Sequence, residues 1–368
     1  MTRLSLRALN RATLERQFLL RRHPLTARQA IRQLAGLQAQ APLAPYAGLW
    51  SRLSAFDPDA LSGLLTERSV VRAAVMRGTV HVVDSEDFAA FRSLFSPLLA
   101  SVTETNFRRD LAGADLAELA RYAGELLAER PLTRVQIGRA LAPRWPGADP
   151  RALAYAATYL VPVVQVPPRG IWGTSAQATF ADAGSWLARP VTDAKPDAVD
   201  QLVLRYLAAF GPATVADVQT WSGLTRLREV TARLQLRRLR GPDGDELVDL
   251  PDAPRPDEDT PAPPRFLPEY DNLLLSHADR RRVIPHLRPP PLPPGNGATR
   301  GTVLIDGQWN ALWKITGTAD RAGLTVTPFR ALTAQEEAAI AEEGTRLLAF
   351  TSPGRTPDVQ FQPPPESP

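Results

Sequence analysis

The chain has 368 residues, of which 44% are hydrophobic, enough to build two or more packed units. It has no cysteine and four scattered histidines, which excludes disulfides, cysteine-ligated zinc and iron–sulfur clusters and disfavours a metal enzyme. The formal net charge is only +4, so a strongly positive surface requires local clustering of the cations.

The N-terminal forty residues are strongly basic and contain a single acid, Glu15. The arginines of this segment are Arg3, Arg7, Arg11, Arg16, Arg21, Arg22, Arg28 and Arg32. Because arginine makes bidentate bonds to phosphate, we predict that the segment contacts nucleic-acid phosphates, above all through Arg3, Arg7 and Arg11. A solvated helix face is the alternative. The sequence shows no membrane span and no apolar core of a signal peptide, so we expect a cytoplasmic protein with no membrane partner.

A weak repeat runs through the region before residue 251. Each copy opens with proline, a small or apolar residue and threonine, where the threonine hydroxyl is suited to capping a helix. The copies are Pro24-Leu25-Thr26, Pro131-Leu132-Thr133 and Pro212-Ala213-Thr214. Apolar residues then recur at helical spacing, and a further helix is expected before each copy, at about 7–22, 115–129 and 197–210.

A short pair of strands, separated by a glycine-containing turn, is predicted after each copy. The pairs are Val70–Val75 with Thr79–Val83, Val161–Val166 with the segment around Trp172, and Gln235–Leu239 with Glu246–Asp249. Helix, capped helix, helix and hairpin is the order of a winged helix-turn-helix. We therefore predict an α+β fold with three tandem winged-helix modules, at residues 1–112, 113–192 and 193–252. Trp172 and Trp221 are interpreted as core residues.

The remainder, 253–368, begins with a linker rich in proline and aspartate. Short apolar runs then predict a small C-terminal β-barrel. The runs are Phe266–Leu275, Val283–Ile284, Thr302–Ile305, Trp309–Ile315 and Leu324–Phe329. A mobile proline-rich loop is expected at Arg288–Arg300, a late helix at Glu336–Arg346 and a disordered tail from Ser352. Arg280, Arg281 and Arg282 form a second candidate basic patch.

Five segments resemble the winged-helix DNA glycosylases of the AlkZ and YcaQ type, a bacterial superfamily. They are Gly36-Leu37-Gln38-Ala39-Gln40, Met76-Arg77-Gly78-Thr79-Val80-His81, Phe210-Gly211-Pro212-Ala213-Thr214, Leu267-Pro268-Glu269-Tyr270-Asp271-Asn272-Leu273-Leu274-Leu275 and Val303-Leu304-Ile305-Asp306-Gly307. The likeness covers nearly the whole chain, and the Gln-x-Gln at Gln38 and Gln40 resembles the AlkZ branch.

Proteins of this type excise N7-alkylated guanines, including bulky adducts and interstrand crosslinks, and some protect producers of DNA-alkylating antibiotics. The resemblance implies a bacterial, nucleoid-associated enzyme that acts as a monomer on duplex DNA without a cofactor or metal. It also implies modules that curve around an open, positively charged DNA channel, with Gln38 and Gln40 at least partly exposed on its wall. Whether the chain is itself one of the antibiotic-resistance glycosylases stays open at this point.

The chemistry fits the two glutamines. Gly36 and Pro42 disfavour a continuous helix around them, and in an extended segment both amides could face one side. An N7-alkylguanine is already cationic and leaves without strong acid catalysis, so neutral amides that position water and stabilise an oxocarbenium-like transition state would suffice. Gln38 and Gln40 are therefore the candidate catalytic residues, and a solvated polar turn is the alternative.

Further residues are candidates for DNA binding. Arg77 and His81 are candidate DNA-binding residues, with a structural role for His81 as an equal alternative, and Arg280 and Arg281 are candidates in the basic patch. Lys195 and Lys314 are the two lysines of the chain and neither is near the pair in sequence, so no Schiff-base lyase activity is expected. The rival hypothesis is a non-enzymatic winged-helix regulator or architectural protein. An RNA-binding module has no supporting motif.

Overall fold

Threonine caps begin three equivalent helices in the computed structural model, which describes residues 1–285, 300–318 and 320–364. The hydroxyls of Thr26, Thr133 and Thr214 each accept a hydrogen bond from the backbone N–H three residues later. The side chain at that later position in turn accepts a hydrogen bond from the backbone N–H of the threonine, which completes a capping box. The predicted starts of all three helices are confirmed.

The first unit runs from the N-terminus to residue 112. Its elements are α1 (Leu6–Arg16), α2 (Ala27–Gln33), β1 (Leu37–Gln38), α3 (Ala44–Arg52), α4 (Pro58–Thr66), β2 (Val70–Ala74), η1 (Met76–Gly78), β3 (Val80–Asp84), α5 (Ser85–Phe91), η2 (Arg92–Phe95) and α6 (Ser96–Phe107). The predicted hairpin of β2 and β3 is present, and it turns at the 3-10 segment η1.

The second and third units repeat the helix order. The second contains α7 (Leu116–Glu129), β4 (Leu132–Thr133), α8 (Arg134–Leu141), α9 (Pro150–Leu160), β5 (Val163–Val166), β6 (Thr179–Asp182) and α10 (Ala183–Leu187). The third contains α11 (Ala198–Phe210), α12 (Val215–Ser222), α13 (Leu227–Arg233), β7 (Arg237–Arg240) and β8 (Glu246–Asp249). The strand pair of the third unit forms a small sheet of its own.

One six-stranded sheet joins the first two units, in the order β1-β3-β2-β5-β6-β4. The junction is the pairing of Arg72 on β2 with Gln165 on β5. The hairpin of the first unit also shares a hydrophobic core with the helices of the third, in which Trp221 is fully buried, as predicted for this residue. These shared layers place the β2–β3 hairpin against elements of the second and the third unit, whereas the boundaries of the modules stay a prediction.

The predicted strand around Trp172 is wrong. The partner of β5 is β6, and Trp172 lies in the long turn between them. Its ring packs against Tyr46 and Phe350, with centroids 4.8 and 5.3 Å apart. Gly170 and Gly173 have positive φ angles, which interrupt an extended ladder, and burial of the indole against α3 and α14 replaces strand pairing.

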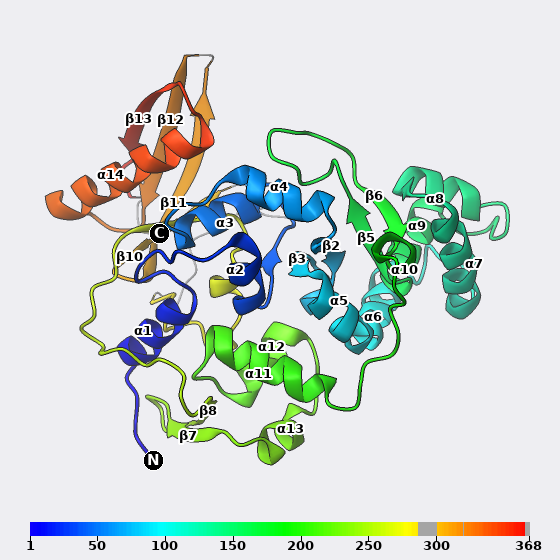
Figure 1. Ribbon diagram of the computed structural model, residues 1–368, viewed down its shortest axis with the longest axis horizontal. Helices are drawn as coiled ribbons and strands as arrows, with labels where there is room; N and C mark the ends of the chain where they lie inside the picture. The colour runs from blue at the N-terminus through cyan, green and yellow to red at the C-terminus, as the bar shows by residue number, and fades with distance from the viewer. Residues whose placement is uncertain (286–299, 319, 365–368) are drawn as a thin grey trace.

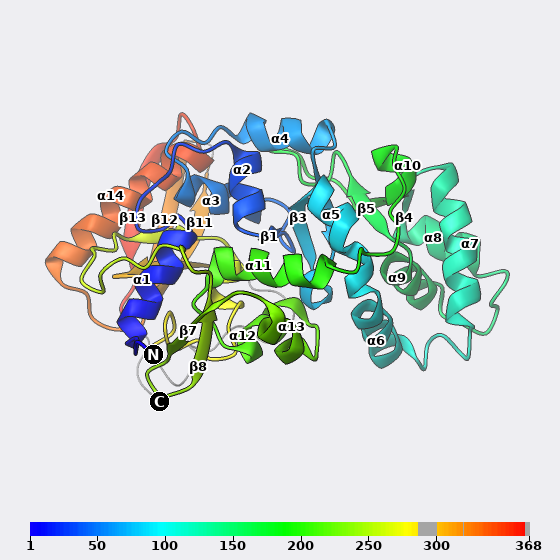
Figure 2. The same cartoon turned by 60° about the horizontal axis from the view of Figure 1, so that its bottom comes forward.

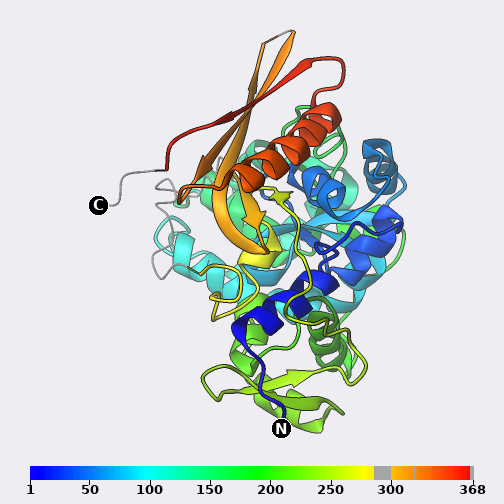
Figure 3. The same cartoon turned by 90° about the vertical axis from the view of Figure 1, so that its left-hand side faces the viewer.

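The C-terminal region forms a five-stranded sheet in the order β13-β12-β11-β10-β9. Its elements are β9 (Arg265–Leu267), η3 (Asn272–Leu274), β10 (Gly301–Ile305), β11 (Gln308–Gly317), β12 (Arg321–Pro328), α14 (Ala334–Thr351) and β13 (Thr356–Phe361). Figure 3 shows α14 lying across one face of the sheet. No ladder between β9 and β13 is present among the described residues, and the prediction of a barrel stays a prediction.

Three further expectations fail or lie outside the described part of this region. Residues from Ser352 are not a disordered tail up to 364, because β13 pairs in parallel with β12 and Val359 and Phe361 pack on the core of the sheet. The run Val283–Ile284 is a turn, in which the buried Val283 accepts a backbone bond from Trp309. The proline-rich loop falls largely on residues 286–299, which the structure does not describe.

The units are arranged around the first one. In Figures 1 and 2, α7, α8 and α9 lie at one end of the molecule, and the C-terminal sheet with α14 lies at the other. The third unit, with α11, α12 and α13, sits against the first between these ends. None of the helices in residues 1–285, 300–318 and 320–364 is both long and apolar enough to cross a bilayer.

Candidate active site

A glycine turn sets the conformation of the Gln-x-Gln segment. After α2 the chain passes through Gly36, whose φ of +95° and close approach to Val83 exclude a side chain: a Cβ there would lie 2.7 Å from Val83 Cγ1. The chain then enters β1, antiparallel to β3, with Gln38 opposite His81. The backbone N–H of Ala39 donates to the Val80 carbonyl at 2.7 Å. The predicted extended segment is therefore present.

The two glutamines occupy different environments. Gln38 is 6% exposed, and its Oε1 accepts a hydrogen bond from Arg77 Nη2 at 2.7 Å. Gln40 is exposed, and its Oε1 has only a long contact of 3.5 Å to the Val80 backbone nitrogen. β1 ends at Gln38, and Gln40 lies in a bend two residues farther along the chain. The expectation that both are exposed is correct for Gln40 and wrong for Gln38.

Arg77 connects the elements around Gln38. It lies in the turn between β2 and β3 with a φ of +55°. Besides Gln38, its guanidinium donates to Asn272 Oδ1 at 2.9 Å and to the Trp221 carbonyl at 3.1 Å. Burial, and secondarily Arg280, lower the pKa of Arg77 to about 10, which leaves it protonated at neutral pH. Its acceptors are neutral, and no carboxylate pairs with it in the described part of the chain.

His81 does not reach solvent. It is fully buried, and its Nδ1 lies 2.9 Å from the Thr79 carbonyl, so Nδ1 carries the proton and Nε2, 3.4 Å from Arg77 Nη2, is an acceptor. Burial, followed by the charge of Arg77, lowers the pKa of His81 to about 3. The ring is therefore neutral and supports the cluster from inside. The prediction that His81 contacts DNA is wrong for this conformation, because the ring is covered on all sides.

The segment around Asp271 and Asn272 holds the site from the opposite side. Asp271 makes a bidentate ion pair with Arg52, both side chains being buried, with N···O distances of 2.9 Å. Asn272 donates to the Gly36 carbonyl at 3.2 Å while its oxygen accepts from Arg77. The sequence motif signalled this segment, but its contact with Gln38 through Arg77 was missed because the partners are far apart in the chain.

The N-terminal arginines are committed to intramolecular contacts. Arg11 is 1% exposed and bonds Asp306 and the Thr260 carbonyl, and Arg7 pairs with Asp306 at 2.6 Å. Arg3 is exposed and donates to the Pro242 carbonyl. The other pairs are Arg16–Asp249, Arg21–Glu15, Arg22–Glu343, Arg28–Asp84 and Arg32–Glu86. Arg11 is buried and joins α1 to the C-terminal sheet, which removes it from contact with a phosphate in this conformation, whereas Arg3 and Arg7 are exposed and their contact with DNA stays a prediction.

Within the described residues, two of the three arginines of the second basic patch have intramolecular partners. Arg281 pairs with Asp279 and Asp243, and Arg282 is buried and donates to the Pro212 carbonyl at 2.8 Å. Arg280 is exposed, has no ion pair within the described residues, and lies close enough to Arg77 to affect its pKa. Of this patch, Arg280 is the residue still available to a DNA phosphate. No group of three or more potential metal-ligating side chains occurs among the described residues.

Comparison with known proteins agrees with this arrangement. A family model described as DNA glycosylase AlkZ-like matches residues 31–350. An interstrand DNA cross-link repair glycosylase of Streptomyces sahachiroi is 23% identical over 367 residues, covering 94% of this chain and 96% of that protein. The solved structure of Streptomyces sahachiroi DNA glycosylase AlkZ matches with a TM-score of 0.77 and 20% identity, over 98% of this chain and all of that chain. The α+β fold is thereby confirmed, and the chain is a distant relative of that glycosylase and not the same protein.

Proposed function

This chain belongs to the DNA glycosylase AlkZ-like family, and we propose that it is a monofunctional DNA glycosylase acting on N7-alkylated purines in duplex DNA. The reaction hydrolyses the N-glycosidic bond and leaves an intact abasic site. Cationic substrates, including bulky and crosslinked ones, are expected because the site offers neutral amides and no strong general base. The curated relative is described as an interstrand DNA cross-link repair glycosylase, which supports this substrate class by analogy.

The observation that carries the proposal is the different hydrogen bonding of Gln38 and Gln40. The Gln38 carbonyl oxygen is held by Arg77, which leaves the NH₂ group of this amide as the possible donor, and that group has no hydrogen bond within the described residues. The Gln40 carbonyl oxygen is exposed and nearly free. In our proposal the Gln40 oxygen accepts from the attacking water, while the Gln38 NH₂ donates to the sugar or phosphate of the damaged nucleotide.

Electrostatics suit a reaction in which positive charge moves from base to sugar. As the N-glycosidic bond breaks, the alkylated base becomes neutral and the sugar gains oxocarbenium character. A carbonyl dipole whose oxygen faces the sugar stabilises that charge, and it needs no reorganisation because β1 fixes the backbone. The bond from the charged Arg77 polarises the Gln38 amide and strengthens its N–H donors.

Base release from duplex DNA that contains one N7-methylguanine tests the proposal. Gln38→Ala and Gln40→Ala should each slow release by about ten- to a thousandfold, the loss of one oriented polar group. DNA affinity should change little, because it depends mainly on phosphate contacts. Gln201→Ala is the matched control, since Gln201 is exposed on α11 and makes no side-chain hydrogen bond within the described residues. Wild-type rates in both site variants would refute the assignment.

The product distinguishes a monofunctional glycosylase from a lyase. Lys195 and Lys314 are the two lysines of the chain, and neither lines the pocket beside Gln40. Borohydride should therefore trap no covalent complex with DNA. Tight binding to DNA with no release of any alkylated base would favour the rival function, a non-enzymatic winged-helix DNA-binding protein.

A further inference from the structure

A pocket of about 190 Å³ lies beside Gln40, where the hairpin of the first unit meets α8 and α9 of the second. It is lined by β-sheet residues on one side and by helix residues on the other. The polar side chains of its wall that matter here are Gln40, Arg72, Arg134, Tyr155, Gln165 and Arg169. The pocket is adjacent to the candidate catalytic amide, but neither the motifs nor the basic N-terminus predicted it.

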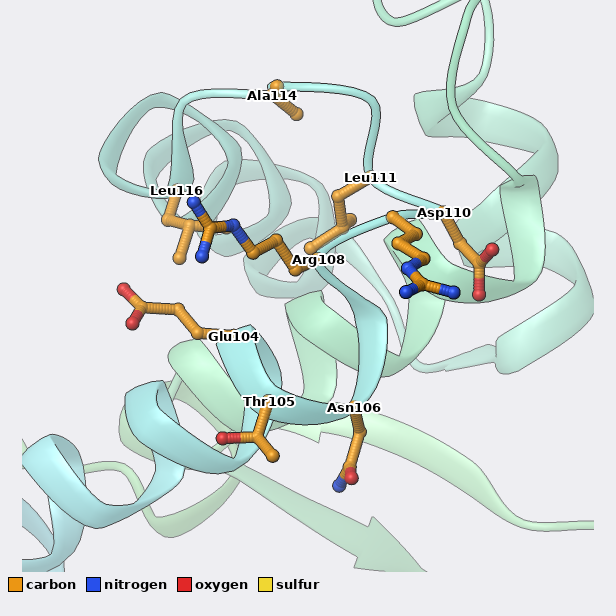
Figure 4. Close-up of a pocket in the computed structure, with 10 residues that line it drawn as sticks. Glu104, Thr105, Asn106, Arg108, Asp110, Leu111, Ala114 and Leu116 are labelled. Carbon is orange, nitrogen blue, oxygen red and sulfur yellow. The ribbon is translucent and has the colours of Figure 1, made fainter.

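The charge of this pocket has one sign. Three arginines line it and no aspartate or glutamate does, and none of the three has a carboxylate partner in the part of the chain that the structure describes. The hollow formed by residues 104–116 between α6 and α7, about 1250 Å³ in volume, is different. There Glu104 and Asp110 lie among arginines, as Figure 4 shows for Arg108. The absence of acids is therefore a property of the pocket beside Gln40 and not of every hollow in the molecule.

The three arginines have different tasks. Arg72 is 2% exposed, and its terminal nitrogens donate to the Ala39 carbonyl at 2.9 Å and the Pro42 carbonyl at 3.3 Å, which fixes the Gln-x-Gln segment from behind. Burial, followed by the charge of Arg169, lowers the pKa of Arg72 to about 10. An anion in the pocket would compensate this buried positive charge.

Arg134 and Arg169 keep donors free for a ligand. Arg134 stacks on Tyr155 and Phe180, with its Cζ 4.1 and 4.8 Å from the ring centroids, and its Nε donates to the Thr158 hydroxyl at 3.4 Å. Arg169 donates only through Nη1, to the Ala176 carbonyl at 2.6 Å, and its buried Nε has no partner in the described residues. Both side chains are held in place, yet several N–H groups lack an acceptor.

The positive charge of the pocket beside Gln40 favours one part of a damaged duplex over another. An N7-alkylated purine is cationic and would be repelled by three guanidinium groups at short range. A phosphodiester is anionic at every physiological pH, and its two non-bridging oxygens match the forked donors of arginine. The pocket therefore disfavours the base and favours the backbone.

We propose that this pocket binds one backbone phosphate of the damaged strand, next to the nucleotide whose base is released. Arg134 and Arg169 donate to the phosphate, and Arg72 holds Gln40 against the same strand. This inference rests on the proposed glycosylase function and names the part of the substrate that positions the sugar at Gln40. The damaged base then lies outside this pocket.

DNA binding to an undamaged duplex tests the pocket without requiring base release. Replacing Arg134 and Arg169 together by glutamine should lower the slope of log affinity against log salt by about 0.9, the value for one phosphate. The loss should not approach twice that value, because both side chains serve one phosphate. Arg139→Gln is the matched control, since Arg139 is an exposed arginine on the same helix α8 that does not line the pocket. An unchanged slope in the double variant, or an equal loss in the control, would overturn the proposal.

A second measurement locates the phosphate. Methylphosphonate linkages, which are neutral, are placed one at a time around a tetrahydrofuran abasic analogue, and binding is measured at low salt. One position close to the analogue should weaken wild-type binding by about tenfold and have no effect on the double variant. Full sensitivity in the double variant, or no sensitive position in the wild type, contradicts the proposal.

Two controls show whether the bound anion is a DNA phosphate or free phosphate, and whether the variants are folded. If inorganic phosphate at constant ionic strength raises the unfolding temperature of the wild type but not of the double variant, while no linkage is sensitive, the pocket binds free phosphate and the proposal fails. The unfolding temperature of each variant alone shows that it is folded. Failure of the glycosylase function would instead appear as absent base release with the phosphate effects intact.

Discussion

At the scale of single residues, Gln38 and Gln40 show how two identical side chains acquire different chemistry. The extended backbone that enters this segment could be predicted from Gly36 and Pro42. The burial of Gln38 could not, because Arg77 and Asn272 come from positions 39 residues and more than 230 residues away. Only the fold determines which amide oxygen is occupied and which remains free.

Arg77 is a positioning residue for Gln38, and a double-mutant cycle can test this role. Arg77→Gln should slow base release about as much as Gln38→Ala, because the Gln38 amide loses the donor that fixes its orientation. The variant that combines both substitutions should be no slower than the slower single variant. If Arg77→Gln acted only by damaging the fold, its unfolding temperature would be lower. The losses of the two single variants would then add in the double variant.

The buried histidines make the fold sensitive to acid. Burial is the first cause that lowers the pKa of His81 and of His277 to about 3, below the unfolded value near 6.5. Between these values the unfolded chain binds a proton that the folded chain does not, so stability falls as pH decreases below about 6.5. Each histidine should remove about 1.4 kcal/mol per pH unit in that window. Urea unfolding at pH 7, 6 and 5 measures the slope, which should be shallower by that amount in His81→Asn; an unchanged slope contradicts the assignment.

At the scale of elements, local patterns were reliable where the determinants are local. The three threonine caps and the first and third hairpins agree with the sequence because a cap or a turn involves only neighbouring residues. The N-terminal arginines have more intramolecular partners than the sequence predicted, for the opposite reason. The acids that neutralise Arg7 and Arg16 are 299 and 233 residues away, so a local charge count overestimates the free positive charge of α1.

Gly36 sets the register of β1, and a matched pair of glycine substitutions can show it. Gly36→Ala places a Cβ 2.7 Å from Val83 at a φ of +95°, so we expect a loss of about 1–3 kcal/mol in the free energy of unfolding. Base release should also slow, because β1 contains Gln38 and leads directly into Gln40. Gly63→Ala is the control: Gly63 lies inside α4, a Cβ there meets nothing within 4 Å, and alanine should stabilise by about 0.5–1 kcal/mol.

Chemical denaturation and single-turnover base release provide the two readouts for this pair. A Gly36→Ala variant as stable and active as the wild type would show that β1 can shift without consequence. That result would also show that the turn at Gly36 does not determine the conformation of the Gln-x-Gln segment.

At the scale of the whole molecule, the shared six-stranded sheet brings the candidate site to the junction of two units. Gln40 is exposed there, and the pocket beside it is lined by three arginines, so a cationic purine is disfavoured in that pocket. A sequence shows the repeats but not that the first two units join through Arg72 and Gln165. The open channel that the resemblance implies stays a prediction, and the tolerance of bulky lesions tests it.

We expect the rate of base release to depend weakly on the size of the N7 substituent. A snug pocket discriminates roughly 10–200-fold for a single methylene, and most glycosylases turn the base into such a pocket. If the damaged base stays outside and only the strand is held, an N7-methylguanine and a bulky N7-alkylguanine should be released within about tenfold of each other. Single-turnover rates on otherwise identical duplexes make the comparison, with unmodified guanine as a control that should remain uncleaved because this neutral base would have to leave as an anion. A loss of a hundredfold or more for the bulky adduct would mean that the base enters a closed pocket, and it would contradict an open site at Gln40 even if N7-methylguanine were excised well.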